Sequence, residues 1–217
     1  MYNAKRFFVN LLLLSGTLTA CSKEPAVEYK LSADQLAWQG YTAGRELRFG
    51  HLQSPKVRTY LVTSVTDRME KAYMGINWLP LPSKEPPRYQ HITVMVQRTD
   101  TVAFPIVALE LLLDYNPNDY SRPELRAVAE WGTFYYGSLP LNEVNRGVPI
   151  DSTVYAATLL PSVTLGPSSY SQVLRLHGRP LGQPAPGSRF IQRLYYARGK
   201  GVVAYEETGS GLWYRLP

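Results

Sequence analysis

The sequence predicts a mainly β protein, formed by a single antiparallel curved sheet or open barrel with one or two short helices. Tyrosine, valine and threonine, which favour strands, are frequent, and tyrosine alone accounts for 16 of the 217 residues. The chain also carries 17 prolines and 16 glycines, which interrupt it at short intervals. Between these breaks, several short segments alternate apolar and polar positions, as strands with one buried face do. A β-sandwich is the alternative arrangement.

A helical turn and three strands are the first expected elements of the folded domain. Ser32 followed by Gln35 fits a capping box, which predicts a short helix over residues 33–38. Strands are expected over residues 46–49, 57–66 and 91–99. The proline-rich segment 79–87 lies between the last two and cannot join a hydrogen-bonded ladder, so it is expected to be a loop.

The middle of the chain contains its most apolar mature stretch, residues 102–115. A buried strand over 106–113 and a short core helix fit this stretch equally well. It is too short to span a membrane. After a turn at 116–119, Ser121 and Glu124 form a second possible capping box, which predicts a helix that ends at Gly132.

The C-terminal half is expected to consist of strands. Three are expected over residues 133–136, 153–160 and 170–176, followed by a loop over 178–187. The last three strands, over 190–197, 202–207 and 212–216, are separated by glycine-rich turns and predict a β-meander. In the final strand, alternation places Leu212, Tyr214 and Leu216 on the face expected to meet the core, with Trp213 and Arg215 opposite.

The N-terminus has the pattern of a secretory signal. Lys5 and Arg6 precede an apolar run that is too short to be a permanent membrane span. The tetrapeptide Leu18-Thr19-Ala20-Cys21 then resembles the lipobox of bacterial lipoproteins. That resemblance implies cleavage before Cys21, a diacylglycerol thioether on its sulfur and acylation of the new amino terminus. We therefore expect a signal peptide over 1–20, a lipidated cysteine and tether over 21–31, and one β domain over 32–217.

Cysteine usage agrees with a lipid anchor. Cys21 is the only cysteine in the chain, so no internal disulfide can form after export. Two or three acyl chains would hold the protein on a membrane essentially permanently. Because Ser22 rather than aspartate follows the cysteine, the enteric sorting rule implies the outer membrane; which face of it the protein occupies is left open.

Two further segments resemble uncharacterised β-rich lipoproteins of Gram-negative bacteria. One is residues 194–205, in which an aromatic strand turns at a glycine pair and meets the next strand. The other is residues 38–49, with the spacing Trp-x-x-Tyr-x-x-Gly. This resemblance implies a shared structure and no particular activity.

The charge distribution argues against a nucleic-acid partner. Removing Lys5 and Arg6 with the signal lowers the net charge from +6 to +4, and the remaining basic residues form no block of like charge. The expected partners are the membrane, through the anchor, and an envelope protein or glycan. A hydrophobic content of 45% excludes a disordered stalk.

No catalytic motif and no metal or cofactor site is predicted. His51, His91 and His177 are isolated in sequence, and no second cysteine is present. Glu110 lies within the apolar stretch, where it is either a buried acid of raised pKa or an outward-facing side chain. The protein is therefore expected to be non-enzymatic; the alternative is an envelope hydrolase with an unrecognised carboxylate or histidine site.

The aromatic residues are the one positive indication of binding. Trp38, Tyr41, Trp78, Tyr135 and Tyr195 are the candidates to line a ligand groove, since such side chains suit a surface with one apolar and one wet side. The alternative is that they fill a thin β core. We expect a membrane-tethered module that binds a protein, apolar or glycan ligand.

Overall fold

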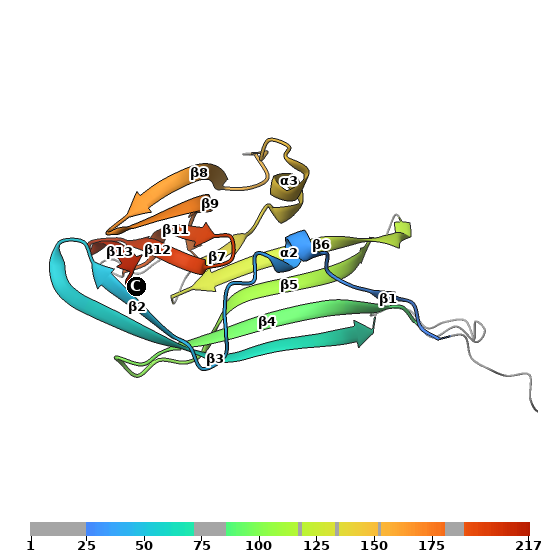
Figure 1. Cartoon of the computed structure of the whole chain (residues 1–217), viewed down its shortest axis with the longest axis horizontal. Coiled ribbons are helices and arrows are strands. Elements are labelled where there is room, and N and C mark those ends of the chain that lie inside the picture. The colour runs from blue at the N-terminus through green and yellow to red at the C-terminus, as the bar shows by residue number, and fades with distance from the viewer. Residues whose placement is uncertain (1–24, 72–85, 117–118, 133–134, 152, 181–188) are drawn as a thin grey trace, which may run out of the picture.

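The computed structural model describes residues 25–71, 86–116, 119–132, 135–151, 153–180 and 189–217. Thirteen strands form one sheet, and two short helices accompany it in this part of the chain: α2 (Ala33–Leu36) and α3 (Leu141–Arg146). The prediction of a single curved, mainly antiparallel sheet is confirmed, and the sandwich alternative is not observed (Figure 1).

The strands follow one another along the sheet in two runs that meet in its middle. The first run is β10 (Arg179–Pro180), β7 (Tyr135–Ser138), β6 (Asp119–Trp131), β5 (Ile106–Asn116), β4 (Arg88–Arg98), β3 (Ser54–Lys71) and β2 (Glu46–His51). The second run is β13 (Gly211–Arg215), β12 (Gly201–Glu207), β11 (Ile191–Ala197), β9 (Ser168–His177) and β8 (Ala157–Leu165). Neighbours are antiparallel, and β1 (Glu28–Tyr29) adds a short parallel pairing to β4.

The predicted C-terminal meander is confirmed, and it holds a central position. β12 pairs with both β11 and β13, and the turns between them use glycines with positive φ, such as Gly199 and Gly209. β13 also pairs with β2, with Arg215 opposite Phe49. The last strand of the chain therefore joins the N-terminal and C-terminal halves of the sheet.

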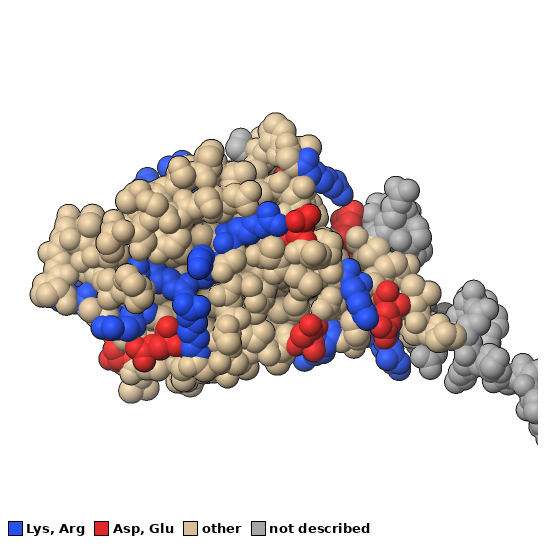
Figure 2. Space-filling model, in the orientation of Figure 1, with Lys and Arg blue, Asp and Glu red and all other residues tan. Residues whose placement is uncertain are grey.

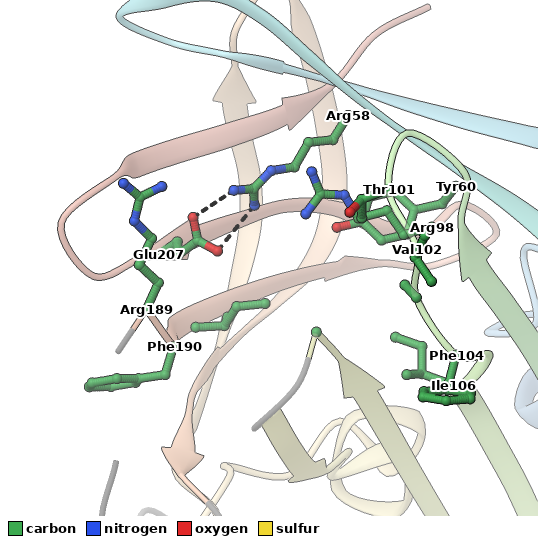
Figure 3. A pocket seen from close by; sticks show the side chains of 13 residues that line it. Arg58, Tyr60, Arg98, Thr101, Val102, Phe104, Ile106, Arg189, Phe190 and Glu207 are labelled. Carbon is green, nitrogen blue, oxygen red and sulfur yellow. Dashed lines mark hydrogen bonds and ion pairs between the residues drawn. The ribbon is translucent and has the colours of Figure 1, made fainter. Parts of the chain in front are cut away.

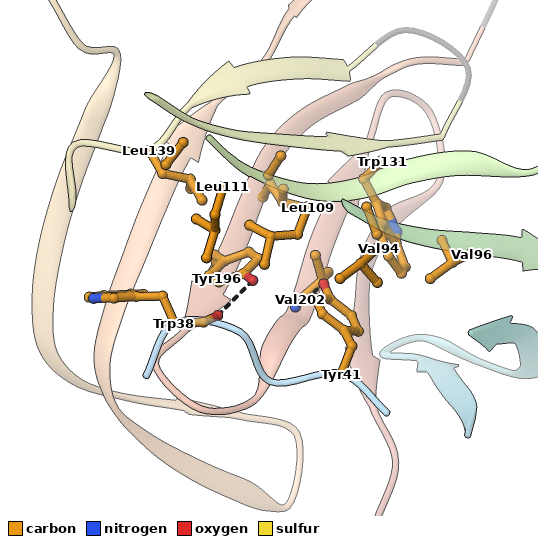
Figure 4. Packing of buried hydrophobic residues seen from close by; sticks show 14 of the residues in the cluster. Trp38, Tyr41, Val94, Val96, Leu109, Leu111, Trp131, Leu139, Tyr196 and Val202 are labelled. Carbon is orange, nitrogen blue, oxygen red and sulfur yellow. Dashed lines mark hydrogen bonds between the residues drawn. The ribbon is translucent and has the colours of Figure 1, made fainter. Parts of the chain in front are cut away.

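The sheet curls until distant strands touch across a common core. The ring of Trp131 in β6 lies 6.2 Å from that of Tyr205 in β12, although five strands separate β6 from β12 along the sheet. Trp131 also lies 5.5 Å from Phe49 in β2. Such contacts require a half-barrel, and its concave face holds the main hydrophobic cluster (Figure 4).

The segment around α2 covers one end of this half-barrel. The predicted capping box is present: the Ser32 hydroxyl accepts the Gln35 N–H, and the Gln35 side chain accepts the Ser32 N–H. Beyond α2, the Tyr41 hydroxyl accepts the Val202 N–H at 2.9 Å, and the Tyr196 hydroxyl donates to the Trp38 carbonyl at 2.9 Å. These bonds hold the N-terminal segment against β11 and β12.

The helix predicted from Ser121 is wrong, because residues 119–131 form β6. β6 pairs with β5 and β7 along its length, and these long-range bonds outweigh the local capping signal. The residues of β6 that belong to the main hydrophobic cluster, Ala127, Ala129 and Trp131, recur at every second position, as in a strand. The same pairing decides that the apolar stretch is a strand, β5, rather than a helix.

Three other expectations differ from the structure. Trp213 and Arg215 face the main core side of β13, while Leu212 and Tyr214 pack partly buried in a smaller cluster on the opposite face. The strand expected over 153–160 begins at Ala157, and α3 was not predicted. The loop expected over 178–187 contains the short strand β10 where it is described. The rest of that loop, and most of the loop expected over 79–87, lies outside the described residues.

Candidate functional site

The aromatic residues predicted to bind a ligand are mostly in the core. Trp38 and Tyr41 are 0% and 4% exposed and both pack near Tyr196. Tyr195 belongs to the smaller cluster on the other face, where its hydroxyl donates to Glu206 at 2.7 Å. That bond and burial, the larger cause, raise the pKa of Tyr195 to about 12.

The three candidates whose side chains the structure describes therefore do not come together as one groove. Successive residues of a strand point to opposite faces, so Tyr195 and Tyr196 lie on opposite sides of β11. Trp38 and Tyr41 pack near Tyr196 and are therefore on the other side of the sheet from Tyr195. Trp78 lies outside the described residues; Tyr135 begins β7 and is described in its backbone only, which pairs with Pro180. Trp38, Tyr41 and Tyr195 are all buried, which agrees with the alternative interpretation that these aromatic residues fill a β core.

A cleft is present instead at the end of the half-barrel where β3 begins and β4 ends. It consists of two adjoining hollows of about 380 Å³ and 520 Å³, which share the side chains of Arg58, Arg98 and Arg189. Figure 3 shows Arg189 and Phe190 on one side of the cleft and Val102, Phe104 and Ile106 on the other. The ion pair between Arg58 and Glu207 lies above them in this view. We call the two hollows together the arginine cleft.

Arg58 is held by several partners and is itself part of the core. Its guanidinium donates to both carboxylate oxygens of Glu207, at 3.1 and 2.8 Å, and to the Tyr205 hydroxyl at 3.3 Å. The side chains of Arg58 and Glu207 are only 11% and 13% exposed. Burial acts to lower the pKa of Arg58, but the bonds to Glu207 and Tyr205 outweigh it and leave the pKa raised. Arg58 is therefore already neutralised.

Arg98 is neutralised in the same way, but nearer to solvent. Its guanidinium donates two bonds of 2.7 Å to the carboxylate of Asp100, which lowers the pKa of that carboxyl. The other two cations of the arginine cleft, Lys56 and Arg189, are exposed. Neither forms an ion pair with a carboxylate among the described residues.

One wall of the cleft is apolar and unusually open. Val102 and Phe104 are 103% and 91% exposed, more than any other large apolar side chain of the described part. Gln97 holds this loop by donating to the Ala103 carbonyl at 2.9 Å. Phe190 and Ile191 also line the smaller hollow of the cleft. Exposed apolar side chains beside a cavity are typical of a surface that a ligand covers.

His51 lies at the polar end of the cleft and links two turns. Its Nε2 bonds to the Ser210 carbonyl, while its Nδ1 accepts the Gln53 N–H at 3.2 Å and meets the Ser54 hydroxyl at 3.0 Å. Its ring packs edge-on against Trp213. Both ring nitrogens are thus engaged in joining the 51–54 turn to the 207–211 turn, which is a structural role.

Two carboxylates and a histidine meet on the outer face of the sheet. His91 in β4 lies between Glu70 of β3, at 3.1 Å from Nδ1, and Glu110 of β5, at 3.0 Å from Nε2. Arg68 binds the same oxygen of Glu70, Oε1, at 2.6 Å, and Arg126 binds the other oxygen of Glu110, Oε2, at 3.3 Å. Glu110 is therefore an outward-facing side chain, the second of the two possibilities stated for it. We call these five side chains the ionic row.

Basic side chains also gather on the face shown in Figure 2, as a band with acidic side chains at its lower end and to its right. Near the β11–β12 turn, Arg198 pairs with Asp34 at 2.8 Å. Arg215, 8% exposed, donates to the Lys200 carbonyl, and its pKa is lowered by burial and by the charge of Arg45. Neither hollow of the arginine cleft extends to this region.

No group of three or more His, Cys, Asp or Glu side chains in the described ranges is arranged to hold a metal ion. The helices within those ranges are too short or too polar to cross a membrane. Comparisons with protein-family models, with curated proteins and with solved structures found no match.

Sequence reasoning missed the arginine cleft because its residues come from five separate stretches of the chain. Arg58, Arg98 and Arg189 are spread over more than half of the chain and look like ordinary surface charges in sequence. The one available signal was Arg58 itself, at a position that alternates with the buried residues Tyr60 and Val62. A charged residue in a buried strand position requires a partner, but only the fold identifies that partner as Glu207.

Proposed function

We propose that the mature protein is a lipid-anchored, non-enzymatic binding module of the cell envelope, which holds its ligand in the arginine cleft. One observation carries the proposal. Two cations that lack a described carboxylate partner share one cleft with a loop whose apolar side chains, Val102 and Phe104, are almost fully exposed. Ligand sites commonly combine an apolar lining with a few convergent polar groups.

The position of the cleft relative to the expected anchor supports this use. β1, which follows the tether, pairs with β4 at Arg88, whereas Arg98 of the same strand lines the cleft. Ten residues of strand at about 3.3 Å each separate these points by roughly 33 Å. In Figure 1, β1 accordingly lies at one end of the long axis and the β4–β5 loop at the other. A ligand can then approach the cleft away from the tethered end.

In-cell photo-crosslinking tests the proposal. A photoreactive amino acid replaces Val102 in the full-length lipoprotein, and a matched control carries it at Val154, which is 63% exposed and outside the cleft. We expect a discrete envelope component to be captured at position 102 and not at 154. Capture of the same components at both positions, or at neither, would contradict the proposal.

The alternative function, an envelope hydrolase, rests on the ionic row. His91 is buried between two carboxylates, and the Thr93 hydroxyl lies 3.1 Å from its Nε2. These side chains do not, however, line either hollow of the cleft. The test is hydrolysis of envelope glycans and peptides by the purified lipoprotein: this alternative requires an activity that His91→Asn abolishes while Lys30→Ala retains it.

A further inference from the structure

We propose that the ligand of the arginine cleft is a small amphiphilic anion: a carboxylate or phosphate group joined directly to an apolar chain or ring. This inference rests on the proposed binding function and names the chemistry of the ligand. It follows from the division of the cleft into a cationic part and an apolar part.

The charge balance of the cleft selects an anion. Its cations are Lys56, Arg58, Arg98 and Arg189, and its carboxylates are Asp100 and Glu207. Both carboxylates are used in two-bond pairs with Arg98 and Arg58, so they cannot neutralise a further cation without breaking those pairs. The remaining excess of two positive charges, from Lys56 and Arg189, is available to an incoming group.

The two cations that carry this excess charge are placed to bind a single anionic head group. Lys56 and Arg189 both line the larger hollow, together with the hydroxyl-bearing Ser54 and Ser210. An arginine provides a planar fork of donors that matches carboxylate and phosphate oxygens, and a lysine adds a compact positive charge. A hydroxyl beside them can donate to a third oxygen.

The second hollow selects an apolar group attached to that anion. It is lined by Val102, Phe104, Ile106, Phe190 and Ile191, and its volume of about 380 Å³ is within the usual range of small-molecule sites, roughly 300–1,000 Å³. An apolar group bound in this hollow would cover the side chains of Val102 and Phe104, which are otherwise exposed to water. Removing apolar surface from water lowers the free energy, so such binding is favourable.

The two parts are adjacent, so one small molecule can reach both. Arg189 lines both hollows, and Phe190 is the next residue of the chain. Figure 3 shows the Arg189 side chain extending toward Glu207, whereas Phe190 extends away from it along the wall. The head group and the apolar group of the ligand should therefore be joined with little or no spacer.

Equilibrium dialysis of the full-length lipidated protein in zwitterionic nanodiscs tests the inference, with empty nanodiscs as the blank. The probes are radiolabelled octyl phosphate, octanoate, phenyl phosphate and octanol. We expect binding of at least one anionic probe in excess of the blank, and about tenfold weaker binding of octanol or none, because octanol lacks the charge-assisted bonds. Octyl phosphate and octanoate represent chain-bearing ligands, and phenyl phosphate represents aromatic ones, so the probe that binds identifies the apolar group.

Two variants and two matched controls locate the binding. Arg189→Ala should weaken binding of the anionic probe about tenfold or more, whereas Lys30→Ala, which removes one positive charge at the β1 end, should not change it. Phe104→Ala should weaken binding of the anion and of octanol alike, whereas Val27→Ala, 58% exposed beside β1, should affect neither. All four positions are exposed, so the variants should fold.

The outcomes separate this inference from the proposed function. Equal binding of octanol and octyl phosphate, or no loss with Arg189→Ala, would overturn the amphiphilic-anion inference. If no probe binds but the crosslinker at Val102 captures an envelope component, the cleft is a binding site for another chemistry and only this inference fails. If no probe binds and position 102 captures nothing, both fail.

Discussion

The guanidinium carbon of Arg58 lies 3.9 Å from the centroid of the Trp213 ring, so a charged residue of β3 is stacked on an aromatic residue of β13. The same guanidinium is paired with Glu207 of β12. Arg58 therefore ties one strand of the N-terminal half to two strands of the C-terminal half, at the wall of the arginine cleft. This relationship makes Arg58 a structural cation and leaves Arg189 and Lys56 as the ones available to a ligand.

Replacing Arg58 should destabilise the fold strongly. Arg58→Ala leaves the carboxylate of Glu207 buried without its partner, which typically costs about 3–5 kcal/mol. Arg98→Ala is the control, because the Arg98–Asp100 pair is about 30% exposed on both sides and should contribute less than about 1 kcal/mol. Urea unfolding measures both. Similar losses in the two variants would show that Arg58 is not a core residue.

Cys21 should be the site of lipid attachment. Radiolabelled fatty acid should enter the wild-type protein and not Cys21→Ser, because only the cysteine sulfur can form the thioether. The variant should also leave the membrane fraction, since one or more buried acyl chains supply the anchoring energy. Equal labelling of both proteins would refute a lipid anchor at this residue.

The ionic row should make stability depend on pH below neutrality. Burial acts to raise the pKa of Glu70, but His91 and Arg68 outweigh it and hold the pKa below its ordinary value of 4.5. A carboxyl with a depressed folded-state pKa contributes stability above its unfolded pKa, and this contribution is lost as the pH falls through the folded pKa. Glu70→Gln should therefore be less stable at neutral pH and should lose less stability than the wild type from about pH 5 to 3. Glu46→Gln, at an exposed position of β2, should follow the wild-type profile in thermal unfolding.

Removing residues 212–217 should prevent folding. The truncation deletes most of β13, whose Trp213 is 3% exposed, and it separates β2 from β12. Losing a buried aromatic side chain alone typically costs about 3–5 kcal/mol, a large part of the stability of a domain. The expected result is aggregated or degraded protein. Deleting residues 22–26 is the control and should leave a folded domain; the deletion stops there because the Val27 carbonyl accepts the Arg88 N–H. A truncated chain with unchanged melting temperature would contradict the central role of β13.

Gly40 should be required for closure of the α2 end of the half-barrel. A Cβ at this position would lie 2.4 Å from the Lys200 nitrogen, closer than van der Waals contact allows. Gly40→Ala should therefore displace the segment and expose the Val202 amide, which now donates to Tyr41. Hydrogen exchange at Val202 should accelerate in Gly40→Ala and stay unchanged in Thr42→Ala, at an exposed position of the same segment. Unchanged exchange in both variants would show that this end tolerates a looser fit.

Local sequence patterns determined the fold class and the elements whose signals are short-ranged. Alternation predicts β4, glycine turns predict the β11–β12–β13 meander, and the Ser32–Gln35 capping box predicts the turn at α2. In each case the information lies within a few residues, because a strand face, a tight turn and a helix cap are local geometries. The lipid anchor is likewise a prediction from local sequence, and its residues lie outside the described part of the chain.

Tertiary structure alone decided the rest, since it depends on which strands become neighbours and how far the sheet curls. Pairing with β5 and β7 makes residues 119–131 a strand despite their capping signal. Curling buries Trp38 and Tyr41, predicted to bind a ligand, and turns the Trp213 face of β13 toward the main core. The same curl brings Arg58, Arg98 and Arg189 to one cleft, although no short segment of the sequence contains more than one of them. A binding site built from long-range contacts has no local signature, because its geometry exists only once the half-barrel has closed.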